Sequence, residues 1–176
     1  MDIIDQLNKD LNSPNINDKI DAIQYIAEED KYKYLTPKLL EMLCLEKDIN
    51  VLNELALCLG KLGVNKAVPI LMEYIRNPDY EDIRGTFLYA LLDLDCDEYF
   101  LDFVKLMCVG NFEVYNHSFS IIESIIDDVD YAQKIEAIEI LENQKILELS
   151  KNQGKPSRFD RINYIVDVLQ LLRSLI

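Results

Sequence analysis

The sequence has only one histidine, His117, and none of its four cysteines forms a C-x-x-C pair. A structural zinc site needs several such ligands, so no zinc site can be completed around His117, which we expect at the surface or in an interface. Cys44, Cys58 and Cys108 fall on apolar faces of expected helices, where a cysteine acts as a small core residue. We therefore expect a reduced, cytoplasmic protein.

Long apolar runs are also absent. The longest uninterrupted one, residues 87–92, is far shorter than the about 20 residues that a membrane-spanning helix needs. The N-terminus shows no basic segment followed by an apolar stretch, which is the pattern of a signal peptide. We expect a chain without a membrane span or a secretory signal.

Motifs of known catalytic sites are missing as well: the chain contains no G-x-S-x-G, P-loop or G-x-G-x-x-G sequence. Carboxylates are plentiful, but none lies in an apolar context that would raise its pKa for acid catalysis. The D-x-D-x-D series that begins at Asp93 resembles the start of a calcium loop. That loop requires glycine and glutamate where this chain has Glu98 and Val104. We expect no enzymatic activity, no metal site and no cofactor.

Basic residues are scarce in the central third of the chain. Residues 79–130 contain 13 acidic side chains and only two basic ones, Arg84 and Lys105, and so carry −11 of the total charge of −14. Such a surface repels phosphate backbones and attracts cations. Composition therefore argues against a nucleic-acid ligand and favours a basic protein partner.

What the sequence does contain is an internal repeat. When Val51 is aligned with Ile83, apolar residues coincide at offsets 0, 4, 5, 7, 8 and 11, which form one face of a helix. A second apolar helical stretch, residues 68–75, separates the two copies. A weaker copy begins at Val114, with Phe119, Ile121, Ile122 and Ile125 at buried offsets and Ser118 where an apolar residue is expected.

Two helices that recur about every 32 residues are typical of an α-solenoid. We predict an all-α fold, a short right-handed α-solenoid of about four to five stacked antiparallel helix pairs. Residues 1–176 are expected to form a single domain. Residues 1–17 would form an N-terminal cap, residues 18–126 the repeats, and residues 127–176 a last repeat with a capping helix that Ser157 begins.

The run D-x-x-V-x-x-x-L-A-x-C-L-G-K-L-G at residues 48–63, followed by V-P-I-L, resembles a HEAT repeat. In that family, a small residue at the position of Ala56 and the pair Leu59-Gly60 allow paired helices to approach closely. The resemblance covers residues 18–126. It implies that the second helix of each pair lines a concave surface, and those helices are expected at residues 18–29, 50–62, 81–93 and 113–126.

Two sets of candidate partner-binding residues follow from this arrangement. The first is a row on the second helices that includes Leu52, Leu57, Tyr89, Tyr115 and Asn116; the alternative is that Leu52 and Leu57 pack on a neighbouring helix. The second is an acidic rim at the helix turns, with the alternative that these carboxylates cap helices, as we expect of Asp97, Glu98 and Asp130. The rim consists of Asp82, Asp93, Asp95, Asp97, Glu98, Asp127, Asp128 and Asp130.

Three functional hypotheses remain open at this stage. In size, charge and expected fold, the chain resembles the immunity proteins of bacterial toxin systems, which implies an acidic inhibitor that neutralises a basic toxin domain such as a nuclease. The second hypothesis is a scaffold that holds a protein or peptide in the concave groove. The third is an accessory role, such as that of the HEAT-like chromophore lyases. We expect a monomer or a weak dimer, with the C-terminal helix either capping the array or forming a dimer.

Overall fold

The computed structural model describes residues 2–151 and 160–176. In this part of the chain all regular secondary structure is helical, with ten α-helices and four short 3-10 helices. The chain divides into two compact units, Met1–Asp95 and Cys96–Ile176. The predicted all-α array of helix pairs is confirmed, because the α-helices follow one another as five pairs joined by short connections.

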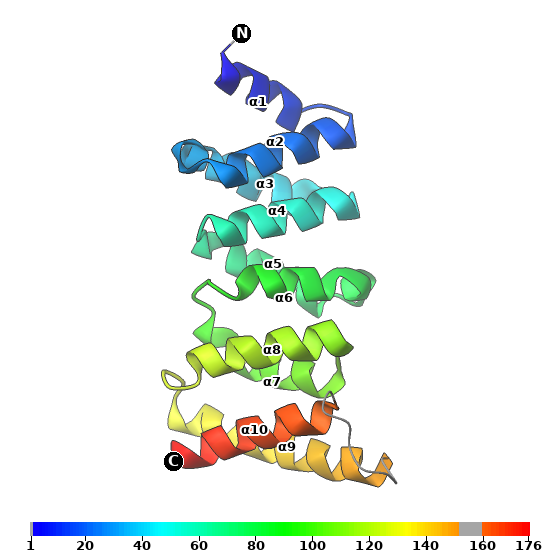
Figure 1. The fold of residues 1–176 in the computed structure, drawn as a ribbon, viewed down its shortest axis with the longest axis vertical. Coiled ribbons are helices and arrows are strands. Elements are labelled where there is room, and N and C mark those ends of the chain that lie inside the picture. Colours follow the sequence, from blue (N-terminus) through cyan, green and yellow to red (C-terminus); the bar gives the residue numbers. More distant parts are fainter. Residues whose placement is uncertain (1, 152–159) are drawn as a thin grey trace. The chain divides into compact units, whose positions relative to one another are not determined.

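The first unit contains three helix pairs. Helices α2, α4 and α6 lie one after another in one layer, with α3 packed against α4 and α5 against α6 behind them (Figure 1). Helix α1 packs on α2. The bounds of these helices are α1 (Ile3–Leu11), α2 (Ile16–Glu28), α3 (Thr36–Leu45), α4 (Ile49–Lys61), α5 (Val68–Arg76) and α6 (Arg84–Leu91).

Local sequence signals explain where the helices of this unit begin and end. The Asp48 carboxylate accepts hydrogen bonds from the backbone N–H groups of residues 50 and 51. These two N–H groups lie in the first turn of α4 and have no acceptor within the helix, so Asp48 caps it. Helix α4 ends before Gly63, which has φ +67°, a conformation that glycine adopts without steric cost. The cap of α2 is Asn15, whose side chain accepts from the N–H of Asn17.

Helices α4 and α6 approach each other closely at Gly60. A Cβ atom at this position would lie 2.4 Å from the carbonyl oxygen of Ala90 and 3.0 Å from its Cα. Helices α4 and α6 therefore touch backbone to backbone, and a side chain here would push them apart. This contact accounts for the small residue that the Leu59-Gly60 motif places in α4.

The helix predicted for residues 81–93 is shorter in the structure. Residues Pro78–Ile83 form a separate 3-10 helix, η3, which begins where the Asn77 side chain accepts from the N–H of Asp79. The backbone of Tyr80 is not helical, with φ −112° and ψ 20°. Helix α6 thus starts only at Arg84, and Asp93 follows it in a turn.

The second unit contains two helix pairs. Helix α7 packs against α8 and α9, and α10 packs against α8 and α9, with α8 and α10 drawn in front in Figure 1. Before α7, a 3-10 helix η4 spans Asp97–Tyr99. The bounds of the helices are α7 (Phe100–Val109), α8 (Phe112–Ile125), α9 (Tyr131–Lys151) and α10 (Arg161–Ser174).

The expectation that Ser157 caps the last helix is wrong. Helix α10 begins at Arg161, with Asp160 at the N-cap position, and Ser157 lies outside the described residues.

The repeat offsets identify most of the core correctly. Leu55, Leu59, Phe87 and Leu91 are fully buried. The thiols of Cys58 and Cys108 are buried, and burial raises their pKa values to about 12 and about 11, so neither is a reactive thiolate at neutral pH.

Cys44 is exposed, so the expectation that it belongs to the core is wrong. The buried face of α3 is set by Leu39 and Leu43, which are one turn apart. Cys44 follows Leu43 directly and is therefore rotated about 100° away from that face.

Ser118 is fully buried on α8, and its hydroxyl has no hydrogen-bond partner among the residues that the structure describes. A buried hydroxyl without a partner loses its hydration and gains nothing in return. We expect Ser118→Ala to raise the free energy of unfolding by about 1 kcal/mol, measured by urea denaturation. The matched control is Ser120→Ala on the same helix. The Ser120 hydroxyl donates to the Asn116 carbonyl at 3.2 Å, so its removal is expected not to raise the free energy of unfolding. Destabilisation by Ser118→Ala would contradict this interpretation.

Candidate functional site

The second helices of the first unit present a continuous surface, which we call the α2–α4–α6 face. Residues on neighbouring helices are in repeat register there: Glu28 on α2 and Lys61 on α4 are 33 residues apart and form an ion pair of 2.8 Å. The same spacing aligns Asp21 with Glu54 and Gln24 with Leu57. The face consists of Asp21, Gln24, Tyr25, Glu28, Glu54, Leu57, Lys61, Tyr89 and Asp93.

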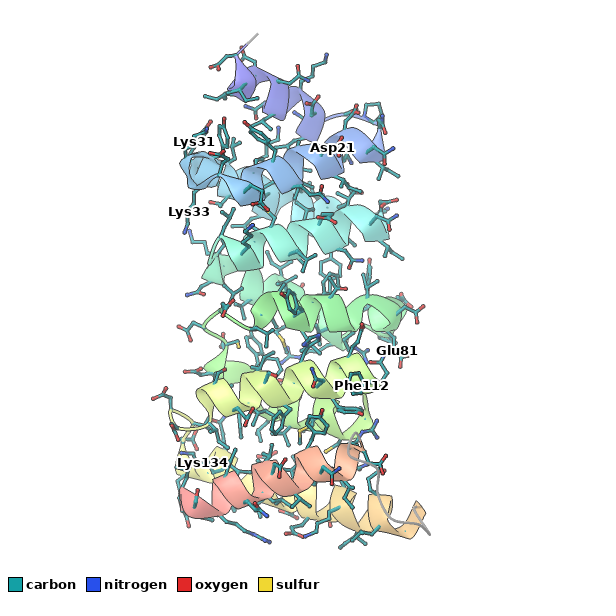
Figure 2. The ribbon with its side chains drawn as sticks, viewed as in Figure 1. Asp21, Lys31, Lys33, Glu81, Phe112 and Lys134 are labelled. Carbon is teal, nitrogen blue, oxygen red and sulfur yellow. The ribbon has the colours of Figure 1, made fainter. Side chains whose placement is uncertain are left out.

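A groove of about 500 Å³ lies between α2 and α4 on this face, and we call it the α2–α4 groove. Its wall on α2 carries Asp21 (Figure 2) together with Tyr25, whose side chain is 42% exposed. The wall on α4 carries Glu54 and the half-buried Leu57. The remaining lining residues are Gln24, Ala27, Glu28, Cys58 and Lys61.

The charges of the α2–α4 groove are only partly balanced. Lys61 neutralises Glu28 at one end. At the other end, Asp21 and Glu54 face the groove from neighbouring helices, and no ion pair among the described residues involves either of them. The groove can therefore accept a cation between these two carboxylates, next to an aromatic ring and an aliphatic side chain.

Several predicted residues of the first unit lie at the surface. Tyr89 on α6 is 56% exposed, and Asp93 and Asp95 are exposed in the turn that follows this helix. Asp82 is exposed in η3. Leu52 is fully buried, so the interpretation of Leu52 as a core residue is correct and its placement in an exposed row is wrong.

The remaining members of the predicted acidic rim belong to the second unit. Glu98 is exposed, Asp97 is half-buried in η4, and Asp127, Asp128 and Asp130 are exposed after α8. Asp130 also caps α9, because its carboxylate accepts from the N–H of Gln133 at 2.9 Å. Its expected capping role is confirmed. A rim that joins the acidic residues of both units stays a prediction.

A buried lysine side chain is hydrogen-bonded to the turn that follows α8. The ammonium group of Lys134, on α9 in Figure 2, donates to the backbone carbonyl of Asp127 at 3.2 Å. The Lys134 side chain is 7% exposed, so this lysine acts in the packing of the turn. It fixes the turn from which the exposed carboxylates of Asp127 and Asp128 project.

Tyr115 is buried, and the expectation that it lies in an exposed row is wrong. Its ring packs edge-on against Tyr164 of α10, with ring centroids 5.1 Å apart, and the Arg161 guanidinium lies 5.4 Å from its centre. Burial raises the pKa of the Tyr115 hydroxyl. The neighbouring Asn116 accepts a hydrogen bond from the Tyr164 hydroxyl at 3.2 Å. The reason for the error is α10, which covers this part of α8 and which the repeat pattern did not place there.

Metal-ligand clusters and helices that could span a membrane are both absent from the described residues. None of their clusters of histidine, cysteine and carboxylate side chains could hold a metal ion. No helix in this part of the chain is long and apolar enough to cross a membrane. His117 is half-buried, and burial lowers the pKa of its imidazole.

Comparison with known proteins gives one result. A family model described as HEAT repeats matches residues 4–92, the part of the chain that contains α1 to α6. No curated protein and no solved structure matches the chain.

Proposed function

Since the chain belongs to the HEAT-repeat family, we propose that it is a non-enzymatic protein-binding module that holds a basic segment of a partner protein on the α2–α4–α6 face. Arrays of this family generally serve as protein-interaction scaffolds. The finer part of the proposal, the basic partner and the face, draws on the charges and side chains of this chain.

The observation that carries the proposal is the composition of the α2–α4 groove. Two carboxylates that form no ion pair within the described part of the chain, Asp21 and Glu54, line it together with Tyr25 and Leu57. A lysine or arginine side chain has a charged end and an apolar stem, and both parts find a counterpart here. The Lys61–Glu28 pair at the other end of the groove supports this interpretation, because there the ammonium group of Lys61 is paired with a carboxylate of the α2 wall.

Exposed aromatic side chains give the face a way to bind neutral parts of the partner. Tyr25 and Tyr89 are 42% and 56% exposed and lie on the two outer helices of the face. Tyrosine is enriched among the residues that dominate binding energy at interfaces. We expect these two rings to anchor apolar side chains of the partner on either side of Leu57.

Neutralisation of a bacterial toxin domain is a narrower form of the same proposal. It draws support only from the net charge of −14 and from the excess of acidic residues in residues 79–130. A scaffold role draws on the same groove and the same face. The two differ in the partner, since an inhibitor must occlude the active site of a basic enzyme and a scaffold need not.

The proposal predicts that binding depends on the two unpaired carboxylates. In the double variant Asp21→Asn, Glu54→Gln, the α2–α4 groove is expected to bind a peptide of alternating arginine and leucine about tenfold more weakly, a loss of about 1.4 kcal/mol. The Kd of this groove is obtained from the amide signals of residues 25 and 57 in heteronuclear NMR of the ¹⁵N-labelled chain. Binding by the unaltered chain should also weaken when ionic strength rises from about 0.01 to about 0.15 M, because the Debye length falls from about 30 to about 8 Å.

The matched control is the double variant Glu41→Gln, Glu73→Gln. It removes the same two charges from exposed positions on the first helices α3 and α5 of the same unit. Its Kd is expected to stay within about twofold of that of the unaltered chain, since general electrostatic attraction is screened. Equal losses in both double variants would show that net charge, and not the groove, attracts the peptide, and would contradict the proposed site.

A further inference from the structure

A second groove lies in the other unit, between its second helices α8 and α10. It has a volume of about 350 Å³ and is lined by Phe119, Glu123, Asp167, Gln170, Leu171 and Ser174. We call it the α8–α10 groove. Its place relative to the helix pairs of its unit corresponds to that of the α2–α4 groove, although the family match ends before this unit, at residue 92.

The two carboxylates of this groove come from different helices and repel each other. Burial raises the pKa of Glu123, and the negative charge of Asp167 raises it further. No ion pair among the described residues involves Glu123 or Asp167. Both side chains are exposed, and no cation of the described part of the chain is paired with them.

The cations of α10 are used elsewhere. Arg161 donates to the Gly110 carbonyl and pairs with Glu148 at 3.5 Å, and Arg173 pairs with Glu142 of α9. The α2–α4 groove contains Lys61 as an internal cation, but no lysine or arginine lines the α8–α10 groove. A cation from outside the chain would take the position that Lys61 occupies in the first unit.

The apolar lining of the groove fits the stem of a basic side chain. Phe119, which the repeat offsets place in the core, is only half-buried, and its ring is held edge-on against Tyr164 with centroids 5.0 Å apart. Leu171 on the opposite helix is 36% exposed. A lysine or arginine can lay its methylene groups between these two side chains and extend its charge to the carboxylates.

We propose that the α8–α10 groove is a second, separate site for a lysine or arginine side chain of the protein partner, with the stem against Phe119 and Leu171 and the cation between Glu123 and Asp167. The inference rests on the proposed function in taking the partner to be a basic protein. It adds that each unit of the chain carries its own site, so that one molecule binds two basic segments.

The test is a titration of the ¹⁵N-labelled full chain with the arginine–leucine peptide, followed by heteronuclear NMR. We expect saturable shifts of the amide signals of residues 119, 123 and 171, and none with a glutamine–leucine peptide. In the double variant Glu123→Gln, Asp167→Asn, the Kd obtained from these signals should rise about tenfold. The signals of residues 25 and 57 in the first unit should titrate as before.

Controls separate this site from general charge effects and from the first groove. The double variant Glu136→Gln, Glu139→Gln, which removes two exposed carboxylates from α9, should leave the Kd at the α8–α10 groove unchanged. The Asp21→Asn, Glu54→Gln variant should also leave it unchanged while losing binding in the first unit. Failure of the first groove alone would therefore leave this inference standing. Absent shifts at residues 119, 123 and 171, an unchanged Kd in the Glu123→Gln, Asp167→Asn variant, or equal shifts with Ca²⁺ alone would overturn it.

Discussion

Replacing Gly60 with alanine is expected to lower the free energy of unfolding by about 2–3 kcal/mol, as overpacking in a tight core does. The new Cβ would lie 2.4 Å from the Ala90 carbonyl oxygen and 3.0 Å from its Cα. These are backbone atoms, so no side-chain rotation can relieve the clash, and α4 and α6 must separate. Because α4 and α6 also carry Leu57 and Tyr89, peptide binding on the α2–α4–α6 face should weaken as well.

Urea denaturation followed by circular dichroism measures this effect. Gly63→Ala is the control: a Cβ there meets open space, and the positive φ alone should cost about 1 kcal/mol. In an unhindered helix, glycine to alanine is stabilising by about 1 kcal/mol. A Gly60→Ala variant that is more stable than the unaltered chain would therefore contradict the close approach of α4 and α6.

Replacing Arg161 with methionine is expected to destabilise the second unit by about 3 kcal/mol, in the range seen when one member of a buried ion pair is removed. The Arg161 guanidinium joins three elements: it donates to the Gly110 carbonyl after α7, pairs with Glu148 of α9, and lies over the Tyr115 ring of α8. Methionine keeps part of the apolar stem. It removes the guanidinium that pairs with Glu148, whose side chain is 13% exposed and also accepts from the amide of Gln144 at 2.9 Å.

Arg173→Met on the same helix is the matched comparison. Arg173 pairs with Glu142, but the two side chains are 55% and 33% exposed, and exposed pairs contribute at most about 1 kcal/mol. Both variants can be measured by urea denaturation of the full chain. Equal losses for Arg161→Met and Arg173→Met would show that Arg161 does not hold the helices of this unit together.

The parts of the fold that depend on neighbours in the sequence could be predicted from it. Offsets within one helix identify Leu55, Leu59, Phe87 and Leu91 as core residues, since a helix has a fixed period. The cap at Asp48 requires only the residues beside it. The resemblance to HEAT repeats indicated a close helix approach at the pair Leu59-Gly60, but between the helices of one pair. In the structure Gly60 instead meets Ala90 of the next pair.

The parts that depend on which helices become neighbours could not be predicted in the same way. Tyr115 occupies an exposed offset on α8, yet α10 covers it, because Tyr164 and Arg161 come from a helix outside the recognised repeats. The α2–α4 groove was missed because the carboxylates of Asp21 and Glu54 meet only when α2 and α4 pack side by side. The 33-residue spacing of these two residues was the available signal, but the repeat comparison aligned only the copies that begin at Val51, Ile83 and Val114.

Photo-crosslinking tests the central claim most directly. An arginine–leucine peptide in which benzoylphenylalanine replaces one leucine can be bound to the full chain, irradiated, and its attachment points identified by mass spectrometry. Binding on the α2–α4–α6 face predicts attachment at Tyr25, Leu57 or Tyr89 in the first unit, with attachment lost in the Asp21→Asn, Glu54→Gln variant. Attachment in that unit confined to the first helices α3 and α5 would contradict the claim.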